Sequence, residues 1–144
     1  MRKLAEVEEA KALMTEAIAW SVMKWMKEKK RVRAVADQAN AALDALDQSV
    51  KASWSHEKKT AYDELAQTAA GSNNKKSAAI SPDVRKFVQT VKELDDEARR
   101  ARMDAENTFD QAERMLSTSM AREGCQKAIH SWDLHEKAIR QAEA

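Results

Sequence analysis

Only three residues in the chain are strong helix breakers: Gly71, Gly124 and Pro82. An average soluble protein contains roughly 7% Gly and about 5% Pro, far more than this. Ala, Glu, Lys, Leu, Arg and Gln, which are good helix formers, fill most of the other positions. With 144 residues, 43% of them hydrophobic, the chain is long enough to bury a core. The sequence therefore predicts a single all-α domain, residues 1–144, built from long helices with few turns.

The clearest interruption is the stretch "AAGSNNKKSAAISP", residues 69–82. Gly71 suits the position just after a helix, and the polar residues that follow it are typical of a loop. Ser81, Pro82 and Asp83 match an N-cap, a proline at the first helical position and a first-turn acid. We therefore expect a first helical arm at about residues 2–69, a loop at about 70–81 and a second arm at about 82–143.

Apolar residues recur every three to four positions along both arms, a spacing typical of coiled coils. Folding the chain back near Lys75 gives a long antiparallel helical hairpin. Two helices alone enclose no interior, so we expect two copies to complete a four-helix bundle as a homodimer. The runner-up architecture is a compact four-helix bundle, with the arms broken near Lys29 and Gly124.

The fold-back places small residues of the two arms opposite each other: Ala98, Ala101 and Ala105 face Ala52, Ser49 and Ala45. Small residues at a helix contact let the backbones approach closely, and they fix the register of the pair. The sequence therefore predicts a tight alanine seam between the arms.

The stretch "IAWSVMKWMKEKKRVRAV", residues 18–35, carries Trp20 and Trp25 five positions apart. In one continuous helix the two side chains would point about 140° apart, and so belong to two apolar stripes. The opposite arm can cover only one stripe, so we expect the other to bind a partner. The predicted partner-binding residues are Leu13, Trp20, Met23, Met26, Lys27, Lys30 and Arg31.

Charge is unevenly distributed, although the formal net charge is only +1. Residues 24–33 form a basic band whose only acid is Glu28. Residues 37–47 and 104–113 contain no basic residue. We call the acids of these two spans the acidic waist: Asp37, Asp44, Asp47, Asp104, Glu106, Asp110 and Glu113. These bands are either solvated faces or surfaces that meet a partner of opposite sign. The nearest such partner is a second copy of the chain, which again indicates a homodimer.

Residues that could support catalysis or metal binding are few. His130 and His135 are about 140° apart around a helix and cannot easily share a metal. Cys125 has no second cysteine to pair with, and His130 points away from it by the same spacing. Glycine-rich phosphate loops, nucleophile elbows and zinc-finger spacings are absent from the sequence. We therefore expect no catalytic, cofactor or metal site, and no enzyme activity.

Partners and compartment follow from the same composition. A single cysteine and the lack of a signal-peptide core indicate a reducing, cytoplasmic location, and no apolar run reaches the roughly 20 residues of a membrane span. The function that the sequence favours is a non-enzymatic structural or protein-interaction protein acting as a homo-oligomer, such as a scaffold, adaptor or chaperone-like protein. The alternative is a peripheral membrane or lipid-binding protein that uses the Trp-, Met- and Lys-rich segment 13–33. The run "KEKKRVR" is too short to favour nucleic-acid binding.

Overall fold

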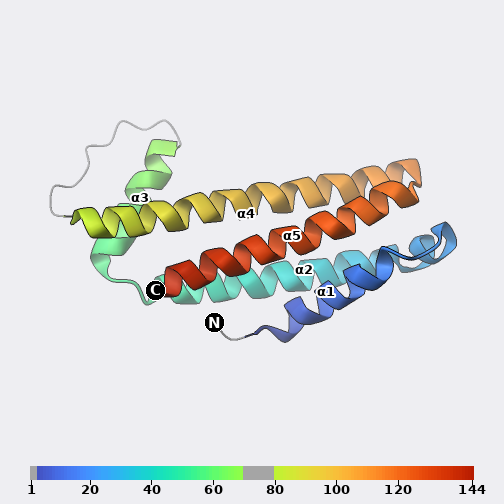
Figure 1. Cartoon of the computed structure of the whole chain (residues 1–144), viewed down its shortest axis with the longest axis horizontal. Coiled ribbons are helices and arrows are strands. Elements are labelled where there is room, and N and C mark those ends of the chain that lie inside the picture. The colour runs from blue at the N-terminus through green and yellow to red at the C-terminus, as the bar shows by residue number, and fades with distance from the viewer. Residues whose placement is uncertain (1–2, 70–79) are drawn as a thin grey trace.

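The computed structural model describes residues 3–69 and 80–144, which form helices and no strand (Figure 1). The helices are α1 (Ala5–Ala17), α2 (Val22–Ala52), α3 (His56–Ala69), α4 (Pro82–Met115) and α5 (Thr118–Glu143). The predicted all-α fold, with helices packed as a hairpin and bundle, is confirmed. The predicted glycine cap at Gly71 lies outside the described residues.

Both arms are interrupted, at places other than those anticipated. The first arm breaks at residues 18–21 and 53–55, and the second breaks at residues 116–117. Lys29 lies inside α2 and Gly124 inside α5, so the expectation of breaks near these two residues is wrong.

A serine caps the start of every helix after α1. The Ser21 hydroxyl accepts a hydrogen bond from the backbone N–H of the residue three positions on, and Ser55, Ser81 and Ser117 do the same. Such a cap satisfies a backbone donor that the helix leaves unpaired, and contributes about 1 kcal/mol. The start at Ser81 and Pro82 was predicted and is confirmed. The other three serines mark the breaks within the arms.

Helix α5 is the central element of the bundle. It runs antiparallel along α4, to which a short turn joins it, and it also contacts α2 and α1 (Figure 1). Helix α3 packs against α4. Many of the buried residues of α5 are small: Ala121, Gly124, Ala128, Ser131, Ala138 and Ala142. Small side chains allow neighbouring helices to approach closely, which lets one helix serve three partners.

The predicted alanine seam involves a different partner helix. Ala98 and Ala105 are buried on α4, but α4 packs along α5 rather than along α2, which carries the predicted partner residues. On the first arm, Ala45, Ser49 and Ala52 are exposed. The tight contact therefore forms between consecutive helices, because the turn at residues 116–117 lets α5 fold back onto α4.

Helix α1 folds back onto α2 and α5 because the chain turns at residues 18–21. Leu13 and Trp20 are each only 5% exposed and belong to the main core cluster. The prediction that they form an outward stripe is wrong, since it assumed one continuous helix through this turn. The single chain therefore encloses an interior of its own.

At Gly124 the packing leaves no room for a side chain. A methyl group there would lie 2.8 Å from Cδ1 of Phe109 on α4. The buried Phe109 ring in turn stacks on Trp25 of α2, with ring centroids 6.1 Å apart. This contact therefore couples α5, α4 and α2.

We expect Gly124→Ala to destabilise the protein by up to about 2 kcal/mol. Alanine gains about 1 kcal/mol of helix propensity, but the forced shift of a pinned aromatic ring outweighs that gain, since overpacking costs about 1–3 kcal/mol. Urea denaturation measures the difference, with Gln126→Ala, exposed on the same helix, as the control. A variant more stable than the wild type would show that the Phe109 ring moves freely.

Candidate functional site

Large apolar side chains are exposed at one end of the bundle. Val22, Met23 and Met26 lie in the first turns of α2, while Met115 and Leu116 lie where α4 ends. Both places are at the same end of the molecule (Figure 1). Met23 is 72% exposed and Met115 is 69% exposed. We call these five residues the apolar end.

The first turns of α2 bury one face and present the other to solvent. Trp25 and Val32 are anchored in the core. Met23, Met26 and Lys30 are exposed. The helical repeat places Met23 and Lys30 opposite Trp25, and Met26 on the flank of the helix, about 100° from Trp25. The buried face therefore holds the first turns of α2 in place and leaves Met23 largely exposed, at 72%, and Met26 about half exposed, at 45%.

Basic residues accompany the apolar end. Residues 22–31 contain five basic residues and one acid. Lys24, Lys27 and Lys30 are exposed and form no ion pair with any described residue. The charges of Lys27 and Lys30 are therefore directed to the solvent and available to an acidic partner, whereas the Lys24 ammonium lies over the Trp20 ring, 5.3 Å from its centroid.

The predicted partner-binding residues fall into two groups. Two of them, Leu13 and Trp20, are buried in the core. The other five are exposed on α2: Met23, Met26, Lys27, Lys30 and Arg31. Sequence reasoning missed Met115 and Leu116, because only the neighbouring serine cap indicated that the chain turns there.

The acidic waist is partly neutralised within the chain. Basic residues from outside its two spans reach it: Arg33 lies 3.1 Å from Asp110 and from Glu113, Arg102 binds Asp44, and Lys127 lies 3.2 Å from Asp104. Lys51, also outside the two spans, lies 3.1 Å from Asp47. Five of the seven acids of the waist are therefore paired with basic residues of the same chain. A second copy is therefore not needed to balance the waist.

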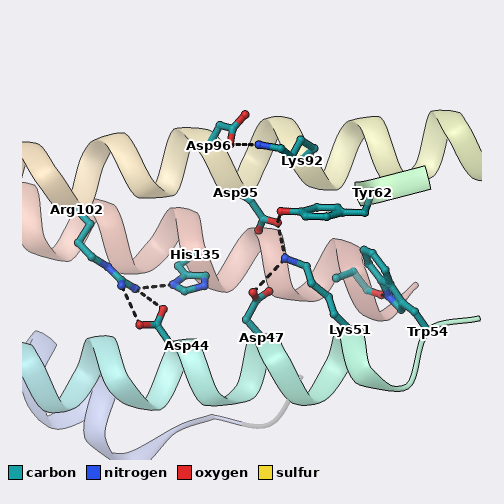
Figure 2. A network of polar contacts seen from close by, with 11 residues as sticks. Asp44, Asp47, Lys51, Trp54, Tyr62, Lys92, Asp95, Asp96, Arg102 and His135 are labelled. Atoms are coloured by element: carbon teal, nitrogen blue, oxygen red, sulfur yellow. Dashed lines mark hydrogen bonds and ion pairs between the residues drawn. The ribbon is translucent and has the colours of Figure 1, made fainter. Parts of the chain in front are cut away.

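A network of polar side chains joins α2 and α4 (Figure 2), and it lines a cavity that we call the polar groove. The guanidinium of Arg102 donates to both carboxylate oxygens of Asp44, each at 3.1 Å. The same guanidinium donates to Nδ1 of His135 on α5, at 3.0 Å. Because arginine only donates, Nδ1 is an acceptor, and His135 is neutral with its proton on Nε2.

A second group of residues joins α3 to the groove. Lys51 donates to Asp47 and to Asp95, and the Tyr62 hydroxyl donates to Asp95 at 2.7 Å (Figure 2). A cavity of about 210 Å³ is lined by both groups of residues. The groove therefore ties α2, α3, α4 and α5 together through long polar side chains.

The protonation states of the groove suit a structural role. Burial lowers the pKa of His135 and the Arg102 guanidinium lowers it further, against the opposing pull of nearby carboxylates. Burial and the hydrogen bond to Asp95 raise the pKa of Tyr62. Elsewhere in the bundle, burial raises the pKa of the Cys125 thiol to about 12, which leaves it a weak nucleophile at neutral pH.

Among residues 3–69 and 80–144, no group of three or more His, Cys, Asp or Glu side chains is arranged to hold a metal ion. Within the same residues, no helix has the length and apolar character needed to cross a membrane. Comparison of the chain with protein-family models, with curated proteins and with solved structures finds no match.

We expect the protein to lose stability as the pH falls below about 6.5, partly because of His135. Its pKa is lower in the folded state than the ordinary 6.5, so below that pH the unfolded chain binds a proton that the folded protein does not. His135→Asn keeps an acceptor for Arg102 and removes this titration.

The measurement is the free energy of unfolding by urea between pH 7.5 and pH 5. The lower limit lies about one and a half units below the ordinary histidine pKa, which applies to the unfolded chain. The slope with pH should be shallower in His135→Asn than in the wild type. His130→Asn, exposed on the same helix, should keep the wild-type slope. Equal slopes in all three proteins would contradict the assignment.

Proposed function

We propose that the protein is a non-enzymatic interaction protein, of a scaffold, adaptor or chaperone-like kind, that works through its apolar end. The observation that carries this proposal is the exposure of five large apolar side chains on regular helices and a defined turn. Exposed apolar patches rimmed by polar residues mark interaction sites on soluble domains. Methionine is well suited to such a surface because its flexible side chain adapts to different partners.

Several features at the same end lower the stability of the isolated chain. Leu116 has a left-handed φ of 49°, which costs a non-glycine residue roughly 1–2 kcal/mol. The indole N–H groups of Trp20 and Trp25 are buried without a hydrogen-bond partner among the described residues. Those of Trp54 and Trp132 both donate hydrogen bonds at 2.8 Å. Local costs of this kind collect at functional sites, which supports a functional role for the apolar end.

The groove chemistry supports the non-enzymatic part of the proposal. Lys51, Asp95 and Asp44 are engaged in ion pairs, and His135 accepts from Arg102. Groups that could act as acids or bases are thus occupied in joining helices.

Self-association remains part of the proposal, as a weak contact. The apolar end offers an area on the order of a few hundred Å², below the roughly 800 Å² per partner of a standard interface. Two copies meeting through the same face would also bring their lysines together. Self-association should therefore rise with salt, which screens that repulsion.

We expect sedimentation to show mainly monomer at micromolar concentration, with a dimer appearing as concentration and salt are raised. Met23→Ser should weaken the dimer about tenfold, since it removes roughly 1.4 kcal/mol of apolar burial. Met103→Ser is the matched control, because Met103 is 52% exposed on α4 outside the apolar end. A dimer that responds equally to both substitutions would show that its contact lies elsewhere.

We expect Leu116→Gly to stabilise the isolated chain by about 0.5–1 kcal/mol. Glycine relieves the left-handed strain, and this gain exceeds the entropy that glycine adds to the unfolded state. Met115→Gly, one residue earlier and still helical, should instead cost about 1 kcal/mol. Thermal denaturation of the two variants compares them, and a less stable Leu116→Gly would mean that this side chain supports the fold.

A further inference from the structure

We propose that the apolar end docks on the surface of an anionic lipid bilayer. This inference rests on the proposed function, because it names the partner of the same surface. It is carried by the combination of unpaired lysines and exposed apolar side chains on one face of α2, and by the small area of the patch.

The geometry of α2 suits shallow insertion. Met23 projects from the face opposite the buried Trp25, and Met26 projects from the adjoining flank of the helix. They could enter the boundary between headgroups and acyl chains, roughly 5–10 Å deep, without any change in the core. Leu116 projects at the neighbouring turn, at the same end of the bundle (Figure 1). Two separate elements can therefore insert together.

The charges around the apolar end match an anionic surface. Lys27 and Lys30 share the outward face of α2 with the methionines, and Lys24 is exposed one turn nearer to the end. Arg114 and Arg122 are exposed close to the turn between α4 and α5. Each such residue near an anionic membrane contributes about fivefold in binding.

The acids at this end reduce that charge only in part. Glu28 lies 3.5 Å from Arg31, and Glu123 lies 3.1 Å from Lys127. Glu16 is exposed at the end of α1. Asp110 and Glu113, in the last turns of α4, pair with Arg33. When Arg33, Arg114, Arg122 and Lys127 are added to the five basic residues between positions 22 and 31, the basic residues at this end still outnumber the acids.

The area of the apolar end helps to decide between a lipid surface and a protein as its partner. A stable protein interface needs a complementary shape over roughly 800 Å² per partner, of which the five exposed apolar side chains supply only a part. A bilayer needs no complementary shape, and a few inserted side chains together with a basic cluster suffice for reversible binding. The size and charge of the patch therefore favour lipid.

The test is co-sedimentation of the full chain with vesicles made from equal amounts of phosphatidylserine and phosphatidylcholine, compared with vesicles of phosphatidylcholine alone. We expect binding to the anionic vesicles, little binding to the neutral ones, and a decrease with salt. Self-association should instead increase with salt, so the direction of the salt effect distinguishes the two processes.

The variants locate the surface. Met23→Ser should weaken vesicle binding about tenfold and Lys27→Gln about fivefold. Leu116→Gly should also weaken binding while leaving the fold at least as stable, so unfolding cannot explain the loss. The matched controls are Met103→Ser and Lys86→Gln, both exposed on α4 away from this end, and both should bind as the wild type does.

The outcomes separate this inference from the proposed function. Failure to bind anionic vesicles, together with a dimer that depends on Met23, would overturn the lipid proposal and leave the apolar end as a protein-binding surface. Vesicle binding that the controls reduce as much as Met23→Ser would also overturn it. Loss of both vesicle binding and Met23-dependent self-association would overturn the proposed function as well.

Discussion

The close contact between α5 and α4 at Gly124 determines the rest of the bundle. Because Gly124 has no side chain, Phe109 can lie against the α5 backbone, and it is there that the ring stacks on Trp25. Trp25 fixes the first turn of α2 in the core, and this directs Met23, on the opposite face, and Met26, on the flank, toward solvent. A packing constraint on one glycine is thus transmitted through two aromatic rings to the surface that we propose as functional.

The central position of α5 also explains the polar groove. With α5 packed between them, α2 and α4 are joined by long side chains, among them Arg102 to Asp44 and Lys51 to Asp95. Partly exposed ion pairs contribute at most about 1 kcal/mol each, so apolar packing holds the bundle together. The pairs instead select which residues of α2 and α4 lie opposite each other, because a shift by one helical turn would leave partly buried charges without partners.

The sequence was sufficient to predict the all-α class and the start of α4, because both depend on local chemistry: the scarcity of helix breakers, and the Ser81–Pro82 cap. The breaks at Ser21, Ser55 and Ser117 could not be predicted in the same way. A capping serine and an exposed serine within a helix look alike in a sequence, and tertiary packing decides between them. The errors on Leu13 and Trp20 followed directly, since one unrecognised turn changed the direction of every preceding side chain. The exposure of Met115 and Leu116 depends on a turn of the same kind.

The four tryptophans show how stability and function are divided within the molecule. Trp54 and Trp132 are buried with their N–H groups bonded to Ala142 and Asn40. Trp20 and Trp25, beside the apolar end, are buried with theirs unbonded, and each unmet donor costs roughly 1–3 kcal/mol. The same end exposes its methionines and holds Leu116 in a left-handed conformation. The buried indoles of Trp54 and Trp132 are thus satisfied, whereas the apolar end departs from several packing rules at once. Such a concentration is expected where side chains serve contacts outside the folded chain.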